Sequence, residues 1–388
     1  MQSDSRVKVG LITNIPTPYR LPLFQMLNAE PGLDFEVVFN ASSEQNRHWQ
    51  LSKQLPFKHS FLPGRTISVW GDDLLSYHVK WGIGTWLKRK RFDVVIVGGW
   101  ASIAQWRTIA LCRRHRVPVI LWSGSTVGEG SLLRRLTLPL VRTLVRSCDA
   151  YVAYGTAARL YLEKLGAPSH RTFVAPNTVD VEQWAIAAAN ADASAKRREL
   201  DLHDRVVFLY VGQLIVRKGV DILLQSFSEL QRRCLRTALV LAGTGPLLLT
   251  LRKQSQDLGL EAVHFVGSVP YQELPAYYAA ADAVVLPSRS EVWGLTLNEA
   301  MASARPVIAS EATGASVDLV KHGHTGWVAA TADAASLTQC LLQVVCLDKE
   351  QRRAIGAAAQ QVVLSQFTIR HAADGFLLAI RCALADHV

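Results

Sequence analysis

Residues Ala283–Ser310 read AVVLPSRSEVWGLTLNEAMASARPVIAS. A continuous apolar run ends at Leu286, a polar loop follows, and a second apolar run begins at Pro306. Continuous apolar runs are typical of strands that are covered on both faces, as in a parallel sheet. The residues after Gly294 have a helical composition. The segment therefore predicts a strand, a loop, a helix and a second strand of an α/β fold.

The same alternation of apolar runs and helical segments recurs along the chain. The other strand-like runs are Val7–Thr13, Phe35–Asn40, Phe92–Gly98, Val117–Trp122, Asp149–Tyr154, Thr172–Pro176, Arg205–Gly212, Thr237–Ala242, Ala262–Gly267 and Gly326–Ala329. The pattern breaks at about residues 181–200, which are Ala-rich and then charged. We therefore expect two Rossmann-like, doubly wound domains facing a central cleft, with ligands at the carboxyl ends of the strands. The expected boundaries are 1–182, a linker at 183–200, 201–366, and a final helix at 367–388 that crosses back to the first domain.

The composition limits the class of protein. Of the 388 residues, 49% are apolar and 19% charged, which is typical of a globular chain, and the net charge of +10 indicates an anionic partner. The six cysteines include no Cys-x-x-Cys pair, so neither a zinc knuckle nor a redox motif is predicted. With no clustered Asp and His residues, we expect no metal or other cofactor. A nicotinamide dehydrogenase is disfavoured because Val7–Thr13 is not followed by Gly-x-Gly-x-x-Gly.

The loop and helix after Leu286 carry residues suited to a nucleotide sugar. Seven residues separate Glu291 in the loop from Glu299 in the helix. The start of a helix offers unpaired amides and the positive end of its dipole, which favour a diphosphate. Gly294 allows close approach of a ligand, and the two carboxylates can accept hydrogen bonds from sugar hydroxyls. Two solvated surface glutamates are the alternative interpretation.

This segment resembles the Glu-x7-Glu signature of the retaining family four glycosyltransferases, which have the GT-B fold. The resemblance implies that Glu291 holds the donor sugar, that Glu299 holds the ribose, and that amides of the helix start receive the phosphates. The donor-binding residues that it implies are Gly212, Gln213, Ser268, Glu291, Trp293, Gly294, Leu295, Thr296 and Glu299.

A second segment, Val211–Val220, places Arg217 and Lys218 at the start of another predicted helix. Adjacent cations there can stabilise a departing diphosphate. Lys218 matches the similar loop of the family, but Gln213 stands where the family has an arginine, so Arg217 is the candidate replacement. We therefore name Lys218, Arg217 and Glu291 as the catalytic candidates, with solvated cations as the alternative for the first two.

The amino-terminal half resembles a Pro-Tyr-Arg variant of the family loop after the first strand. Pro18, Tyr19 and Arg20 are its candidates for binding the acceptor or a phosphate, together with Ser123 and Ser125 after a later strand. An ordinary arginine at a helix start is the alternative for Arg20. Residues 131–147 carry leucines at helical spacing among arginines, which suits either a helix on an anionic membrane or a core-facing helix.

The sequence therefore predicts a retaining glycosyltransferase that uses a UDP- or GDP-sugar and forms an α-glycosidic bond. By family association, its acceptor is a glycan or a lipid-linked acceptor in polysaccharide or glycolipid biosynthesis, and nucleic acid is not a partner. The alternatives are a GT-B-like sugar-nucleotide epimerase or hydrolase, and a non-catalytic sugar-binding protein. Without a leader or a spanning segment in the sequence, we expect a cytoplasmic protein, with contact at the inner face of the membrane as an open alternative.

Overall fold

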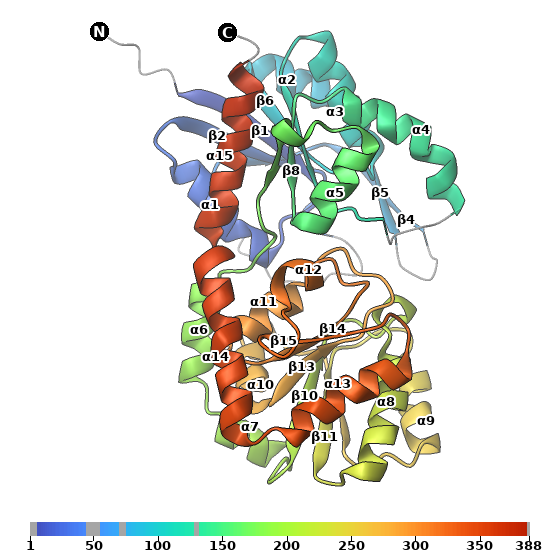
Figure 1. Ribbon diagram of the computed structural model, residues 1–388. Helices are drawn as coiled ribbons and strands as arrows, with labels where there is room; N and C mark the ends of the chain where they lie inside the picture. The colour runs from blue at the N-terminus through green and yellow to red at the C-terminus, as the bar shows by residue number, and fades with distance from the viewer. Residues whose placement is uncertain (1–5, 44–54, 70–74, 128–131, 386–388) are drawn as a thin grey trace. The chain divides into compact units, whose positions relative to one another are not determined.

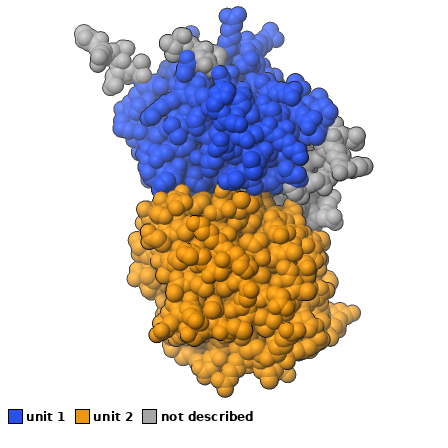
Figure 2. Space-filling model, viewed as in Figure 1, with its two compact units in different colours: residues 1–178, 369–388 blue, residues 179–368 orange. Residues whose placement is uncertain are grey.

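The computed structural model describes residues 6–43, 55–69, 75–127 and 132–385. The chain forms two compact units, which are coloured separately in Figure 2. Unit 1 comprises Met1–Thr178 and Ile369–Val388, and unit 2 comprises Val179–Thr368. The chain therefore leaves unit 1 once and returns to it for the final helix.

Unit 1 contains a seven-stranded parallel sheet with the strand order β3-β2-β1-β6-β7-β8-β9. Figure 1 labels strands β1, β2, β6 and β8 of this sheet. Along β6, Val94 and Ile96 join one apolar cluster, while Val95 and Val97 join the cluster on the other face. Burial on both faces is the reason that these strands are continuously apolar. The strands are β1 (Val7–Thr13), β2 (Leu33–Phe39), β3 (His59–Phe61), β6 (Val94–Gly98), β7 (Val119–Ser123), β8 (Ala150–Ala153) and β9 (Thr172–Val174).

Helices cover both faces of this sheet. Helices α1 (Leu21–Ala29) and α15 (Ile369–Ala385) contribute to the cluster on one face. The other face is covered by α2 (Ile83–Lys90), α3 (Ile103–Arg114), α4 (Leu132–Arg146) and α5 (Thr156–Leu165). The final helix of the sequence thus packs within unit 1, where it contacts α1, β8 and β9.

Three strands of unit 1 were not predicted. They are β3 and the antiparallel pair β4 (Gly64–Val69) and β5 (Leu75–Lys80). Strand β3 has only three residues, half-buried or exposed, and the pair lacks the continuous apolar run on which the prediction depended. Short or polar strands leave little periodic signal in a sequence.

Unit 2 contains a six-stranded parallel sheet with the order β12-β11-β10-β13-β14-β15. Its central strands are buried on both faces, as in unit 1. The strands are β10 (Val206–Val211), β11 (Thr237–Ala242), β12 (Val263–Gly267), β13 (Ala283–Leu286), β14 (Val307–Ser310) and β15 (Gly326–Ala329).

The helices of unit 2 also flank its sheet. Those that pack with the cluster around Phe227 are α8 (Val220–Arg233), α9 (Leu248–Asp257) and α13 (Ala334–Cys346). The remaining helices, several of which contact one another, are α6 (Val181–Asn190), α7 (Ala193–Glu199), α10 (Leu274–Ala280), α11 (Leu295–Ala302), α12 (Ser316–Leu319) and α14 (Lys349–Gln366).

The segment 183–200, expected as a linker, belongs instead to two helices of unit 2. Helix α6 contacts α10, α11 and α14, and α7 contacts α10. The side chains of Asp180 and Asp192 cap the two helices by accepting hydrogen bonds from the backbone N–H groups of Gln183 and Ala195. The Ala-rich composition that suggested a linker is therefore that of a packed helix.

Candidate donor site

Helix α11 begins at the carboxyl end of β13, where the sequence placed the phosphate-binding amides. Gly294 is its N-cap and adopts a left-handed conformation with φ of 97°. A Cβ there would lie 2.7 Å from Leu286 Cδ2 and 2.9 Å from Thr313 Cγ2, so these side chains would have to shift, and the left-handed conformation itself favours glycine. The hydroxyl of Thr296 donates a 3.3 Å hydrogen bond to Val211 O, which ties the start of α11 to the end of β10.

Glu299 lies one turn into α11 and is buried. The hydroxyl of Tyr278 donates a 2.6 Å hydrogen bond to Glu299 Oε2. Burial raises the pKa of the Glu299 carboxyl to about 7, although the hydrogen bond from Tyr278 and the charge of Lys218 both oppose the rise. Glu299 can therefore change its charge near neutral pH when a ligand alters its surroundings.

Glu291 forms the centre of a charged cluster in the preceding loop. Lys218 Nζ donates a hydrogen bond to Glu291 Oε2, and Arg217 Nη1 lies 3.5 Å from the same oxygen. Although burial opposes it, the charges of Lys218 and Arg217 hold the pKa of Glu291 below its ordinary value. The structure thus brings together the three residues that the sequence named as catalytic candidates.

A second glycine fixes the position of this cluster. Gly219 ends the turn that carries Arg217 and Lys218, and its φ is 67°. A Cβ at Gly219 would lie only 2.2 Å from the carbonyl oxygen of Pro287. The turn after β10 therefore lies directly against the loop after β13, and only glycine allows this approach.

An ion pair that the sequence analysis did not single out holds the same two loops together. Arg289 donates hydrogen bonds of 2.7 and 2.6 Å to the two carboxylate oxygens of Asp221. Its backbone N–H also donates to Arg217 O at 2.8 Å. The sequence alone does not indicate that Asp221, in the first turn of α8, and Arg289, in the Pro-Ser-Arg loop, are in contact. The fold shows this contact.

The other predicted donor-binding residues lie at the same edge of the sheet. Gln213 follows β10, and its carbonyl oxygen accepts a 2.7 Å hydrogen bond from Tyr210. Trp293 has a buried side chain whose Nε1 donates to Asn298 Oδ1 at 2.9 Å, so it packs inside unit 2. Ser268 is exposed after β12, an edge strand separated from β10 by β11.

In unit 1, Arg20 stacks over Trp122, with its guanidinium carbon 4.5 Å from the ring centroid. It donates hydrogen bonds to Tyr154 Oη and, at 3.4 Å, to Thr13 Oγ1. Its Nε has no hydrogen-bond partner among the described residues. The cavity beside Arg20 has a volume of about 10 Å³, which is room for about one water molecule.

The four remaining candidates lie at the carboxyl edge of the same sheet. Pro18 and Tyr19 form a short 3-10 turn with Arg20 after β1. Ser123 ends β7 and is buried, and its Oγ accepts a 3.2 Å hydrogen bond from the backbone N–H of Ser125. Trp122 and Tyr154, which frame the Arg20 guanidinium, were not predicted because neither is adjacent to it in the sequence.

Two family models match this chain. Residues 192–362 match "Glycosyl transferases group 1" and residues 37–183 match "Glycosyltransferase Family 4". The GDP-mannose-dependent alpha-(1-6)-phosphatidylinositol monomannoside mannosyltransferase of Mycolicibacterium smegmatis is 32% identical over 60% of this chain and 63% of that protein. The D-inositol 3-phosphate glycosyltransferase of Nocardia farcinica is 30% identical over 74% of this chain and 64% of that protein. The chain thus spans less than two thirds of the length of either relative.

Solved structures also resemble it. HepE of Anabaena, in complex with UDP, superposes with a TM-score of 0.76 and 18% identity over 97% of this chain and 99% of that chain. Sucrose-phosphate synthase from Thermosynechococcus elongatus gives a TM-score of 0.73 with 17% identity over 98% of this chain and 100% of that chain. The fold is that of the GT-B glycosyltransferases. Because the two family models match one segment in each unit, the chain belongs to the glycosyltransferases of the family four type.

The glycine at position 219 gives a first test of the site. We expect Gly219→Ala to lower the free energy of unfolding by more than Gly259→Ala, measured by denaturant titration. Both glycines are left-handed, with φ of 67° and 65°, but a Cβ at Gly259 would meet nothing within 4 Å. Gly259→Ala should therefore cost roughly 1–2 kcal/mol, and the clash at Gly219 roughly 1–3 kcal/mol more. Equal losses would show that the two loops do not depend on this close approach.

The raised pKa of Glu299 predicts a pH-dependent stability. Between the ordinary pKa of 4.5 and about 7, the folded state binds the Glu299 proton more tightly than the unfolded chain. The stability that this proton confers is complete at low pH and is lost as the pH rises through about 7. The free energy of unfolding of Glu299→Gln, taken relative to that of wild type, should therefore rise by roughly 3 kcal/mol between about pH 4.5 and pH 8. The exposed control Glu261→Gln should show no such trend, and a flat difference for Glu299→Gln would contradict the raised pKa.

Proposed function

We propose that this protein transfers a sugar from a nucleoside diphosphate sugar to a glycan or lipid-linked acceptor and retains the α configuration. The observation that carries the proposal is the cluster of Lys218, Arg217 and Glu291 beside the start of α11. Cations and free helix amides at the carboxyl edge of a parallel sheet form a site for a diphosphate. The matches to glycosyltransferase families support a transferase as the class of enzyme.

The donor is proposed to bind along the carboxyl edge of unit 2. The amides of residues 293–296 would receive the phosphates, because the first N–H groups of a helix have no intrahelical acceptor. Glu299 would accept a hydrogen bond from the ribose and Glu291 from the donor sugar. Ser268 would lie toward the base, and Gly212 and Gln213 would lie beside the diphosphate.

The proposed catalytic role of Lys218 and Arg217 is to stabilise the negative charge of the departing diphosphate. Their pairing with Glu291 holds both cations in place before a donor binds, so little reorganisation is needed during the reaction. Arg217 would supply the charge that the family obtains from an arginine at the position of Gln213. We propose that these cations replace a metal ion. A donor phosphate oxygen would take the proton of the acceptor hydroxyl.

Both UDP and GDP remain candidates for the nucleotide. The name of the mannosyltransferase relative specifies GDP-mannose, whereas the HepE structure holds UDP. For the acceptor, we propose residues of unit 1, with Arg20 and Ser125 as the polar contacts and Pro18, Tyr19 and Ser123 shaping the same edge. A GT-B-like epimerase or hydrolase is the alternative, and it would release a free product in place of a glycosylated acceptor.

Calorimetry with UDP, GDP and their sugars tests the donor site. We expect one diphosphate to bind, and Lys218→Ala to weaken it by roughly 1–3 kcal/mol through loss of a charge-assisted contact. Glu299→Gln should weaken binding mainly above about pH 7, where the wild-type carboxyl is ionised and accepts from the ribose.

The control variant is Lys321→Ala, which removes an exposed cation of unit 2 outside the proposed site. It should bind like wild type, and a chelator should change neither affinity nor turnover. The proposal is wrong if no nucleotide binds or if Lys218→Ala binds as tightly as Lys321→Ala.

We also propose that α4 contacts an anionic membrane. Leu140 is 62% exposed on this helix, next to exposed Arg142 and Thr143, while Val141 and Leu144 are buried in unit 1. An exposed apolar side chain beside a cation suits an anionic lipid surface. None of the described residues forms a helix that is long and apolar enough to span a membrane.

Sedimentation with vesicles tests the membrane contact. The protein should sediment with vesicles that contain phosphatidylglycerol more than with vesicles of phosphatidylcholine alone, and Leu140→Ser with Arg142→Gln should reduce this difference. The matched control, Leu249→Ser with Lys253→Gln, changes an exposed leucine and a cation on α9. Equal sedimentation with both kinds of vesicle would rule the contact out.

A further inference from the structure

Unit 2 contains a polar cavity at the edge of its sheet opposite the candidate donor site. Asp282 immediately precedes β13 and Pro306 immediately precedes β14, so this cavity lies at the amino ends of strands whose carboxyl ends form the candidate donor site. Its volume is about 240 Å³, far more than one water molecule needs. The residues that line it are Ala193, Ser194, Arg197, Ala279, Asp282, Arg305, Pro306, Lys349, Arg352 and Arg353.

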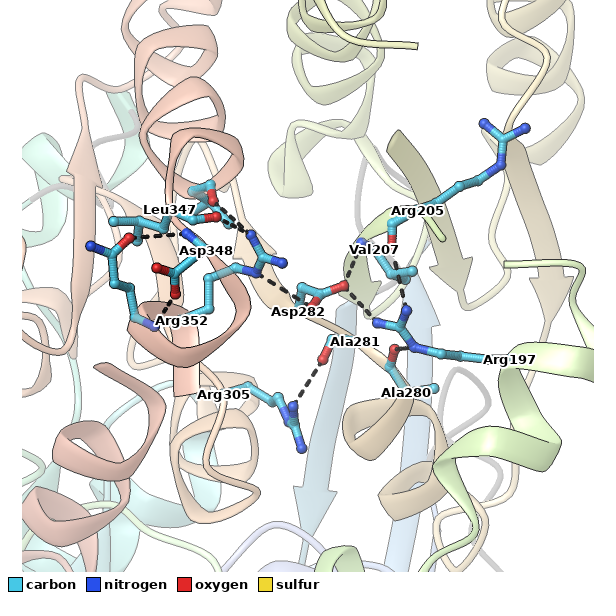
Figure 3. Close-up of polar contacts among 12 residues, drawn as sticks. Arg197, Arg205, Val207, Ala280, Ala281, Asp282, Arg305, Leu347, Asp348 and Arg352 are labelled. Carbon is cyan, nitrogen blue, oxygen red and sulfur yellow. Dashed lines mark hydrogen bonds and ion pairs between the residues drawn. The ribbon is translucent and has the colours of Figure 1, made fainter. Parts of the chain in front are cut away.

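The floor of the cavity is an acidic residue between two arginines (Figure 3). Asp282 Oδ2 accepts hydrogen bonds of 2.6 Å from Arg197 Nη2 and 2.9 Å from the backbone N–H of Val207. On the other side, Arg352 Nε lies 3.5 Å from Asp282 Oδ1 and has no hydrogen-bond partner among the described residues. The side chains of Asp282 and Arg352 are only 12% and 13% exposed.

Three further cations surround this floor without a carboxylate of their own. Among the residues that the structure describes, Arg305 donates only to the backbone oxygens of Ser303 and Ala281, each at 3.2 Å. Lys349 and Arg353 are exposed on the first turns of α14 and form no ion pair within the described ranges. Five basic side chains and a single carboxylate therefore line the cavity.

Such an excess of like charge is unfavourable unless an anion balances it. Burial lowers the pKa of the Arg305 guanidinium, and although Asp282 opposes this, the charges of Arg197 and Arg353 lower it further. The contacts of Arg197 and Arg352 with Asp282 and the hydrogen bond from Arg305 to Ala281 O anchor the start of β13. That structural role leaves Lys349 and Arg353 unexplained. The start of α14 adds the positive end of a helix dipole, although Asp348 already caps it.

We propose that this cavity, which we call the amino-edge pocket, binds a small anion that carries phosphate groups. Lys349 and Arg353 at its rim can donate to the phosphate groups, and Arg305 and Arg352 beneath them add positive charge. Guanidinium groups match the oxygens of phosphate in geometry and charge. The pocket lies at the edge of the sheet opposite the donor site, so its occupant is distinct from the nucleotide sugar. The ligand is either a free phosphorylated solute or the phosphorylated headgroup of a lipid.

Inorganic pyrophosphate is the probe, and calorimetry on the full chain is the measurement. The titration is made with saturating UDP or GDP, so that pyrophosphate cannot report on the donor site. We expect one pyrophosphate per chain, with an affinity that falls as salt is added. Lys349→Gln with Arg353→Gln should weaken it at least roughly tenfold. These two side chains are exposed, so the variant keeps the fold.

Two comparisons separate binding in the pocket from general attraction to a basic protein. Lys253→Gln with Arg233→Gln removes the same charge from exposed positions on α9 and α8 and should bind pyrophosphate like wild type. Ser194→Asp places a carboxylate at the pocket, near the start of α7, where a negative charge favours the helix. This variant should keep or raise the unfolding temperature while it weakens pyrophosphate binding.

Vesicles of phosphatidylcholine with phosphatidylglycerol distinguish the two sources of phosphate. If the Lys349 and Arg353 variant sediments less with these vesicles than the Lys253 and Arg233 variant does, the ligand is a lipid headgroup. If only pyrophosphate binding changes, it is a free solute. The proposal is overturned if pyrophosphate and vesicles each bind equally to both double variants. A pocket that binds pyrophosphate in a chain that binds no nucleotide would refute the proposed donor site and leave this inference intact.

Discussion

The candidate donor site depends on the close approach of two loops, the turn after β10 and the loop after β13. The approach is possible because Gly219 has no side chain, so that the Pro287 carbonyl oxygen can occupy the space that a Cβ would fill. The Asp221–Arg289 pair and the pairing of Lys218 with Glu291 then hold the loops from either side. Cations and carboxylates that are distant in the sequence thereby become one cluster.

Sequence reasoning predicted those parts of the fold that carry a strong periodic signal. The long apolar runs that are buried on both faces became the central strands of two parallel sheets, and the segment with the two glutamates became a strand, a loop and a helix. The strand β3 and the β4–β5 pair were missed because each is short or lacks an apolar run. Residues 183–200 resembled a linker because alanine gives a weak apolar stripe, although α6 packs on three helices.

The site, like the fold, could be predicted only in part from the sequence. The chemical roles of Lys218, Glu291 and Glu299 could be predicted from the residues next to them in the sequence. Their contact partners could not, because a partner such as Tyr278 is separated from Glu299 by a strand and a loop. The environment that raises the Glu299 pKa is set by burial, which depends on the packing of whole helices. Arg20 is a similar case, since the aromatic rings around it come from β7 and the end of β8.

The return of the chain to unit 1 has a consequence during synthesis on the ribosome. The ring of Phe376 in α15 packs against that of Trp122, with centroids 5.1 Å apart, so the face of the first sheet that α1 covers in part is completed only by the last helix. At about 5–20 residues per second, the roughly 200 residues between β9 and α15 take on the order of 10–40 s to translate. For that time the apolar face of the nascent first sheet is covered only in part, by α1, while the whole of unit 2 is made and can fold. The early half of this protein is therefore the part that needs protection from aggregation, and the second half is the one able to mature first.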